Sequence, residues 1–190
     1  LDEEGITFDE PKLKIMGIEA VKSSTPEICR TRIKQAINII MSKQESDLHK
    51  FVKDFKQEFL KLPAEAVSFP RSCNNMKKYY SSSDVFIKGT PIHVKGALIY
   101  NHQIKEFGLQ NKYPLIQEGD KIKFVKLLEA NPFKFDVISY VTQLPKEFKL
   151  KDYVDYELQF EKTFIDPIRF ILQPIGWTPE PKASLEAFFG

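Results

Sequence analysis

Residues 72–83, "SCNNMKKYYSSS", bring lysine, tyrosine, asparagine and serine side chains together without one acidic residue. These side chains all donate hydrogen bonds, and the phosphate oxygens of nucleic acids accept such bonds. Lys77 and Lys78 add positive charge, which attracts a phosphate backbone. The stretch therefore predicts a loop that grips nucleic acid. A solvated polar loop, whose lysines only maintain solubility, is an equally good interpretation of this stretch alone.

The positive charge of the chain is concentrated around this stretch. The formal net charge of all 190 residues is only +2. Residues 71–105, however, carry six lysines and arginines against a single acid, Asp84, whereas the segments before and after are slightly acidic. A nucleic-acid surface needs a local excess of this kind. The six cations are Arg71, Lys77, Lys78, Lys88, Lys95 and Lys105.

Helices and strands are expected on both sides of this basic segment. Apolar residues recur at helical spacing over residues 26–43, 46–62 and 91–108. Alternating and β-branched residues predict strands at 121–126 and 136–141. The aromatic stripe of the second helix is typical of a buried core. These elements have to position the basic segment.

The last part of the chain differs in character. Residues 152–177 predict a helix that Pro167 either kinks or restarts. Three prolines within residues 174–181 then predict a semi-rigid tether, which a short apolar tip follows. The sequence thus predicts an α+β fold, mainly helical, with a small antiparallel β element and an extended C-terminal tail.

The sequence contains no recognisable catalytic or metal-binding pattern. Its three histidines and two cysteines lack metal-ligand spacing, and a Gly-rich phosphate loop and a nucleophile elbow are absent. Cys29 and Cys73 are expected to be free thiols in a reducing compartment. No apolar run approaches the roughly 20 residues that cross a bilayer. We therefore expect a binding module with no catalytic residue, no metal site and no membrane partner.

Four patches, in order along the chain, resemble the family B DNA polymerases of T-even-like phages. "PKLKIMGIEAVKSSTPEICR" is similar to the end of the palm and the entry to the thumb. "SCNNMKKYY" with "PIHVKGALIYNHQIK", and "EGDKIKFVKLLEANPF" with "DYELQFEKTFIDPI", are similar to parts of the thumb. "KASLEAFFG" resembles the C-terminal peptide with which these polymerases bind their sliding clamp.

The resemblance implies three parts and two sets of binding residues. The parts are a palm-end remnant at 1–22, a thumb domain at 23–177 and a clamp-binding tail at 178–190. The implied DNA-binding residues are Asn74, Asn75, Lys77, Lys78, Tyr79, Lys88, Lys95 and Lys162, and the implied clamp-binding residues are Leu185, Phe188 and Phe189. One departure concerns Asp166, which stands where the phage pattern often has a second basic residue near Lys162.

In the family, a two-metal site on palm aspartates performs nucleotidyl transfer. Those aspartates, the exonuclease carboxylates and the fingers have no counterpart here, so the resemblance implies an inactive fragment without a cofactor, whose parent palm binds Mg²⁺. The expected partners are primer–template DNA, a sliding clamp, and palm and fingers on the same or a separate chain, in the cytoplasm of an infected bacterial host. Two alternatives are a thumb-bearing subunit of a split polymerase and a non-catalytic nucleic-acid or clamp-binding accessory protein.

Overall fold

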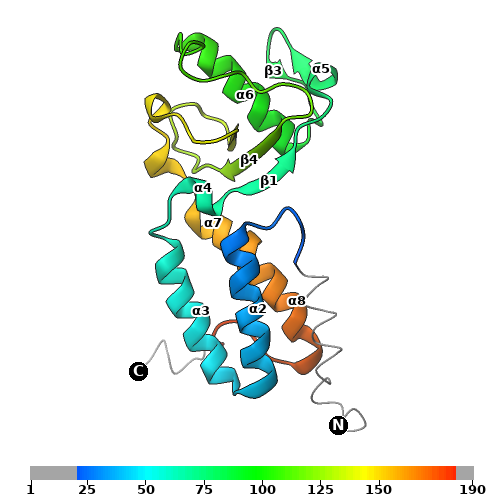
Figure 1. Ribbon diagram of the computed structural model, residues 1–190, viewed down its shortest axis with the longest axis vertical. Helices are drawn as coiled ribbons and strands as arrows, with labels where there is room; N and C mark the ends of the chain where they lie inside the picture. The colour runs from blue at the N-terminus through cyan, green and yellow to red at the C-terminus, as the bar shows by residue number, and fades with distance from the viewer. Residues whose placement is uncertain (1–20, 183–190) are drawn as a thin grey trace. The chain divides into compact units, whose positions relative to one another are not determined.

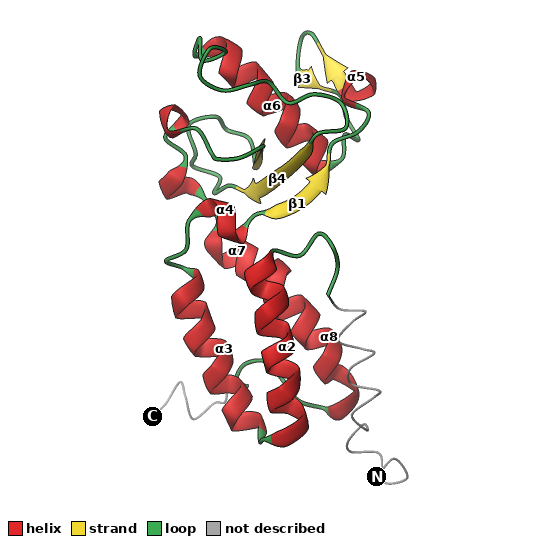
Figure 2. Ribbon diagram, in the orientation of Figure 1, coloured by secondary structure: helices red, strands yellow, loops and turns green. Residues whose placement is uncertain are grey.

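The computed structural model describes residues 21–182, which divide into two compact units (Figure 1). Of these residues, unit 1 comprises 21–61 and 160–182, and unit 2 comprises 62–159. The described residues confirm a mainly helical α+β fold with a small antiparallel β element (Figure 2). The expected palm-end remnant, apart from its last two residues, and the expected clamp-binding Leu185, Phe188 and Phe189 lie outside the described residues.

Unit 1 is built around α2 (Glu27–Ser42) and α3 (Glu45–Phe59), two helices that the sequence predicted. Pro26 directly precedes α2, where its fixed φ suits a helix start. The first turn of α3 is held by a reciprocal capping box between Gln44 and Asp47. Arg32 of α2 joins the two helices through an ion pair of 2.7 Å with Glu58 of α3.

The aromatic stripe of α3 is buried, as the sequence predicted. Phe55 and Phe59 pack against Phe160 and Phe164 of the last helical segment, with ring centroids 4.8 Å apart for Phe55 and Phe164 and 5.1 Å apart for Phe59 and Phe160. Edge-to-face pairs of this kind add to the burial of the ring surfaces. The stripe is therefore the core of unit 1 and not a ligand site.

The last helical segment contains a π-helical turn. The turn Glu161–Ile165 follows α7 (Tyr156–Phe160) and precedes α8 (Asp166–Leu172). The N–H of Asp166 donates to the carbonyl of Glu161, five residues back. Pro167 has no N–H to donate to the carbonyl of Thr163, so the regular pattern fails at this position. Pro167 thus lies in the first turn of α8, within one continuous helical run.

Part of the expected tether is attached to α3. The N–H of Thr178 donates to a carboxylate oxygen of Glu45 at 2.9 Å, and Nε2 of His49 donates to the carbonyl of Thr178 at 2.9 Å. The next residue, Pro179, is buried. The segment 174–181 is therefore fixed to unit 1 near Thr178.

Unit 2 contains an antiparallel sheet of three strands in the order β1 (Phe69–Ser72), β4 (Lys121–Lys126) and β5 (Val137–Tyr140). The sequence predicted β4 and β5 but not β1. Pro70, which pairs with Lys123, obscures the strand pattern of β1. Proline is tolerated there because β1 is an edge strand and needs no donor on its outer side.

Helix α6 (Ile92–Glu106) covers one face of this sheet (Figure 2). It ends as predicted, because Gly108 adopts a φ of 66°, which terminates the helix. Val94, Ala97, Leu98 and Ile104 are buried, also as predicted. The short elements α4 (Ala64–Val67), α5 (Met76–Tyr79) and the hairpin β2 (Tyr80–Ser81) and β3 (Val85–Phe86) complete unit 2.

Gly96 allows α6 to approach β5 closely. A Cβ atom at Gly96 would lie 2.8 Å from the backbone nitrogen of Ser139, and it would also collide with the Oγ of that serine. Ser139 is fully buried and donates from its Oγ to the carbonyl of His93 at 2.9 Å. The helix is therefore bound to the strand through a contact that only glycine permits.

We expect the Gly96→Ala variant to lose about 1–3 kcal/mol of unfolding free energy, because the added methyl group forces α6 away from β5. A loss of stability would be evidence for the close contact, since a glycine-to-alanine change inside a helix otherwise stabilises a protein by about 0.5–1 kcal/mol. Urea denaturation would measure the difference. His102→Ala on the exposed side of α6 is the control and should change stability little. A stabilised Gly96→Ala variant would contradict the close contact.

Candidate nucleic-acid interface

The basic segment forms a short helix and a hairpin. Asn75 adopts a left-handed conformation with a φ of 67°, and α5 begins directly after it. The N–H groups at the start of α5 have no acceptor within the helix, and the carboxylate of Glu118 accepts from two of them, that of Asn75 at 2.5 Å and that of Met76 at 3.0 Å. Cys73 adds two backbone hydrogen bonds to the same loop, from its N–H to Asp120 and from the N–H of Gly119 to its carbonyl. Glu118 and this loop thus fix the start of the segment.

The hairpin that follows is tightly closed. Tyr80 pairs with Phe86 and Ser81 with Val85, while Ser81 Oγ accepts from the N–H of Asp84 at 3.2 Å. Val85 has a φ of 72°, which is unfavourable for a β-branched residue and costs about 1–3 kcal/mol. Phe86 packs against Phe135 with ring centroids 5.7 Å apart. The hairpin is therefore anchored on the loop between β4 and β5.

The structure brings most of the expected DNA-binding residues together in unit 2. Asn74, Asn75, Lys77, Lys78 and Lys88 are all exposed on or beside α5 and the hairpin. Their side chains can therefore reach a phosphate backbone.

The two tyrosines of "KKYY" have different surroundings. Tyr79, which the resemblance implies, is partly buried and packs against the core of unit 2, and Nζ of Lys78 lies 5.2 Å from its ring centroid. Tyr80 is 60% exposed. Tyr80 is thus the more exposed of the two rings, a difference that the sequence of two adjacent tyrosines does not reveal.

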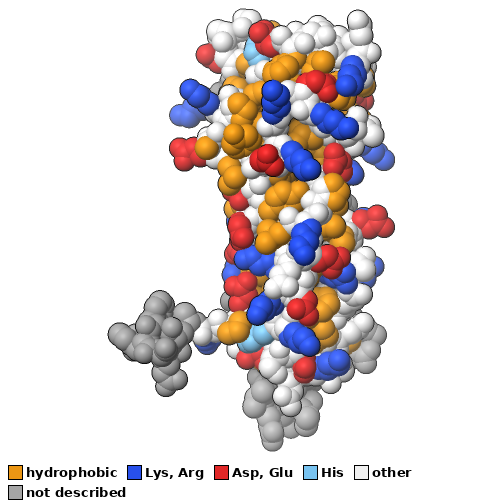
Figure 3. Space-filling view, turned by 90° about the vertical axis from the view of Figure 1, so that its left-hand side faces the viewer, with side chains coloured by type: hydrophobic (Ala, Val, Ile, Leu, Met, Phe, Trp, Pro, Cys, Tyr) orange, Lys and Arg blue, Asp and Glu red, His pale blue; other side chains and the backbone are white. Residues whose placement is uncertain are grey.

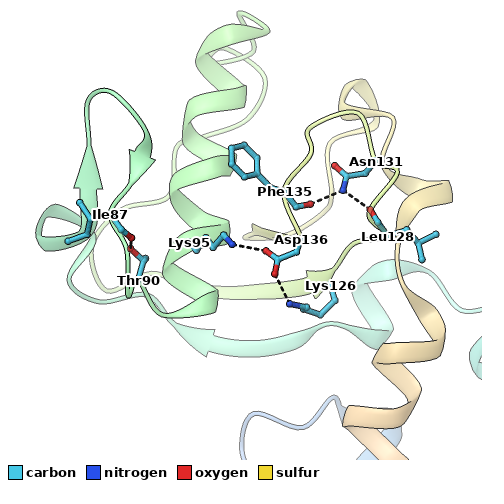
Figure 4. Close-up of polar contacts among 8 residues, drawn as sticks. All are labelled: Ile87, Thr90, Lys95, Lys126, Leu128, Asn131, Phe135 and Asp136. Atoms are coloured by element: carbon cyan, nitrogen blue, oxygen red, sulfur yellow. Dashed lines mark hydrogen bonds and ion pairs between the residues drawn. The ribbon is translucent and has the colours of Figure 1, made fainter.

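Lys95 is not free in this structure. Its Nζ donates to Oδ1 of Asp136 at 2.8 Å, and Nζ of Lys126 donates to Oδ2 of the same carboxylate at 3.1 Å (Figure 4). Lys95 also lies over the ring of Phe86, 5.0 Å from its centroid. Partial burial raises the pKa of Asp136, but the hydrogen bonds from Lys95 and Lys126 outweigh it and hold that pKa below its ordinary value. Nothing in the sequence pattern pointed to this cluster.

Asn131 holds the loop that carries Asp136. The amide of this buried residue donates to the carbonyls of Leu128 and Phe135, each at 2.7 Å (Figure 4). Its Oδ1 accepts from the N–H of Phe133 at 3.0 Å. The loop between β4 and β5 is therefore ordered internally, which fixes the start of β5 and with it Asp136.

Lys162 lies in unit 1 and has an acidic neighbour. Its Nζ is 3.3 Å from Oδ2 of Asp166, the acid that departs from the phage pattern. Arg169 bridges Asp166 and Glu161, at 3.1 Å from each. The positive charge of Lys162 is thus partly compensated.

Other kinds of site find little support in residues 21–182. No group of three His, Cys, Asp or Glu side chains there could hold a metal ion. Cys29 and Cys73 are buried free thiols, and burial raises the pKa of each to about 11. The helices of this range are all too short or too polar to traverse a membrane. On the face drawn in Figure 3, lysine and arginine side chains are interspersed with aspartate and glutamate.

The chain is similar along its whole length to DNA-directed DNA polymerases of bacteriophages. It is 31% identical to the enzyme of Enterobacteria phage T4 over 193 aligned residues, and this alignment covers 100% of the chain. It is 35% identical to the enzyme of Escherichia phage RB69, in an alignment that covers 99% of the chain. The chain spans only 21% of the length of either relative. No family model matches it. The resemblance to the DNA polymerases of T-even-like phages is thereby confirmed.

We expect the Glu118→Ala variant to loosen the start of α5, because the N–H groups of Asn75 and Met76 lose their shared acceptor. Losing a helix cap costs about 1 kcal/mol, so these amides should exchange with solvent roughly fivefold faster. Hydrogen-exchange NMR would measure this. Glu106→Ala, at the exposed end of α6, is the control. Unchanged exchange at Met76 would show that Glu118 does not hold the segment.

Proposed function

We propose that the chain is the thumb domain of a replicative phage-type DNA polymerase and grips the primer–template duplex by its backbone. The observation that carries this proposal is the similarity, over the whole chain, to two phage DNA-directed DNA polymerases. The proposed parts are a palm-end remnant at 1–22, the thumb at 23–177 and a sliding-clamp-binding tail at 178–190. Under this proposal the chain acts in the cytoplasm of an infected bacterial host, and nucleotidyl transfer belongs to the palm.

The chemistry of the basic segment supports duplex binding. A polymerase has to hold every sequence, so its thumb needs contacts to phosphates and sugars rather than to base edges. Lys77, Lys78 and Lys88 are exposed, and lysine offers a mobile point charge in place of the planar fork with which arginine recognises guanine. Glu118 and the hairpin pairing give these lysines a fixed base. The segment therefore combines sequence-independent contacts with a defined position.

Lys95 and Lys162 have a different proposed role from Lys77, Lys78 and Lys88. Both are paired with carboxylates, Lys95 with Asp136 and Lys162 with Asp166. They contact DNA only if these pairs open or if the phosphate joins them. The main grip is therefore assigned to Lys77, Lys78 and Lys88, with Asn74 and Asn75 shaping the loop.

We expect Lys77→Ala/Lys78→Ala to weaken duplex binding and to flatten its salt dependence. Each lost phosphate contact reduces the slope of log affinity against log salt by about 0.9. Fluorescence anisotropy with a labelled primer–template at several salt concentrations would measure both quantities.

Lys50→Ala/Lys53→Ala is the matched control, because it removes two exposed charges from α3 instead. If the control weakens binding as much as Lys77→Ala/Lys78→Ala does, the effect reflects net charge and not the basic segment. Duplex binding that ignores salt would contradict the proposed grip.

The tail supplies the second part of the proposal. Leu185, Phe188 and Phe189 follow a proline-containing segment and suit insertion into an apolar pocket of a sliding clamp. Attachment of Thr178 to α3 gives this tail a fixed origin on unit 1. A thumb encoded separately from its palm is the alternative arrangement, and co-purification with a palm-bearing chain would favour it.

We expect deletion of residues 182–190 to abolish binding to the sliding clamp of the same replication system while duplex binding is retained. The deletion removes the three apolar anchors but leaves the basic segment intact. Surface plasmon resonance on immobilised clamp would measure the loss, with Lys182→Ala as the control. Clamp binding that survives the deletion would overturn this role of the tail.

A further inference from the structure

The carboxylate of Asp136 is shared by two lysines from different elements. Lys95 comes from the first turns of α6 and reaches Oδ1 at 2.8 Å, whereas Lys126 ends β4 and reaches Oδ2 at 3.1 Å (Figure 4). Each ammonium group thus faces its own oxygen of one anion. The two non-bridging oxygens of a nucleic-acid phosphate offer two cations a similar pair of acceptors.

Both lysines are held in place. The side chain of each is only 24% exposed, and Lys95 is further fixed over the ring of Phe86. A lysine that is already ordered loses less side-chain entropy when it binds an anion than a mobile one does. The pair is therefore preorganised, unlike the exposed Lys77 and Lys78.

Asp136 is the accessible member of the cluster. Its side chain is 52% exposed. Ion pairs at such an exposed position are weak, so the two lysines can exchange the carboxylate for another anion. Its charge repels a phosphate for as long as it stays at this position. An arriving phosphate must either displace the carboxylate or bind beside it with a lower affinity because of the repulsion. Asp136 therefore opposes phosphate binding at Lys95 and Lys126.

We propose that Lys95 and Lys126 together bind one phosphate of the DNA backbone and that Asp136 occupies this site in the free chain. This inference rests on the proposed function for the identity of the ligand, but the anion site can be tested without DNA. It adds Lys126 to the duplex-contacting residues. It also assigns to Asp136 the role of an internal competitor that weakens binding to phosphate.

The test compares Asp136→Asn with Glu129→Gln in the full chain. Both variants remove one acid from the loop between β4 and β5, but Glu129 is exposed and has no ion-pair partner among residues 21–182, so it controls for net charge. Asp136→Asn should bind primer–template duplex about three- to tenfold tighter than the Glu129→Gln control, the gain expected from releasing two exposed ion pairs. Adding Lys126→Met, which keeps the aliphatic stem, should remove the gain.

A second readout uses inorganic phosphate as the probe. The ammonium NMR signals of Lys95 and Lys126 should shift on titration, and Asp136→Asn should respond at a several-fold lower phosphate concentration than the wild-type chain. Melting midpoints would verify that the variants fold, and Asp136→Ala serves as a second variant should asparagine disturb the loop.

The outcomes separate the inference from the proposed function. If wild-type chain binds duplex but Asp136→Asn equals Glu129→Gln in both readouts, the inference is wrong and the thumb proposal stands. If no variant binds duplex but the lysine signals report tighter phosphate binding in Asp136→Asn, the anion site is supported and duplex binding by this chain is contradicted. A folded Asp136→Asn chain with weaker phosphate binding would overturn the inference outright.

Discussion

The close contact between α6 and β5 at Gly96 is the constraint on which the arrangement of unit 2 depends. Because Gly96 has no side chain, the helix can approach the backbone of Ser139. Lys95 precedes Gly96 in the helix, and Asp136 directly precedes β5. The same contact therefore sets the distance between Lys95 and Asp136, and a shift of the helix would separate the charges as well as open the core.

The carboxylates of Glu118 and Asp136 form hydrogen bonds in or beside the basic segment of unit 2. The positive charge that this segment offers to a ligand therefore differs from the charge counted along the sequence. Residues 71–105 carry a large formal excess of positive charge, but Glu118 and Asp136 come from later in the chain and enter the same region. Glu118 accepts hydrogen bonds from backbone N–H groups, whereas Asp136 pairs with one lysine of this segment, Lys95, and with Lys126 of β4. A count along the sequence cannot separate these two uses, although they affect an approaching phosphate differently.

The sequence predicted the elements with strong local signals. The helices α2, α3 and α6 have complete apolar stripes and recognisable ends, and β4 and β5 have alternation or β-branched runs. The sequence did not predict interactions between residues far apart in the chain. Strand β1 contains Pro70 and forms a strand because it pairs with β4. The two lysines that pair with Asp136, Lys95 and Lys126, are likewise far apart in the sequence. Exposure was equally inaccessible, since two adjacent tyrosines, Tyr79 and Tyr80, share their local signals but not their surroundings.

The attachment of Thr178 to Glu45 and His49 alters what the proline-containing segment can do. A segment attached to unit 1 only up to Pro174 would have its last fixed point there, whereas the hydrogen bonds at Thr178 and the burial of Pro179 move that point farther along the chain. For a flexible link that still spans the required distance, effective concentration rises as length falls. If the proposed tail binds a partner, the hydrogen bonds of Glu45 and His49 to Thr178 would therefore help to set the effective concentration of that partner at unit 1.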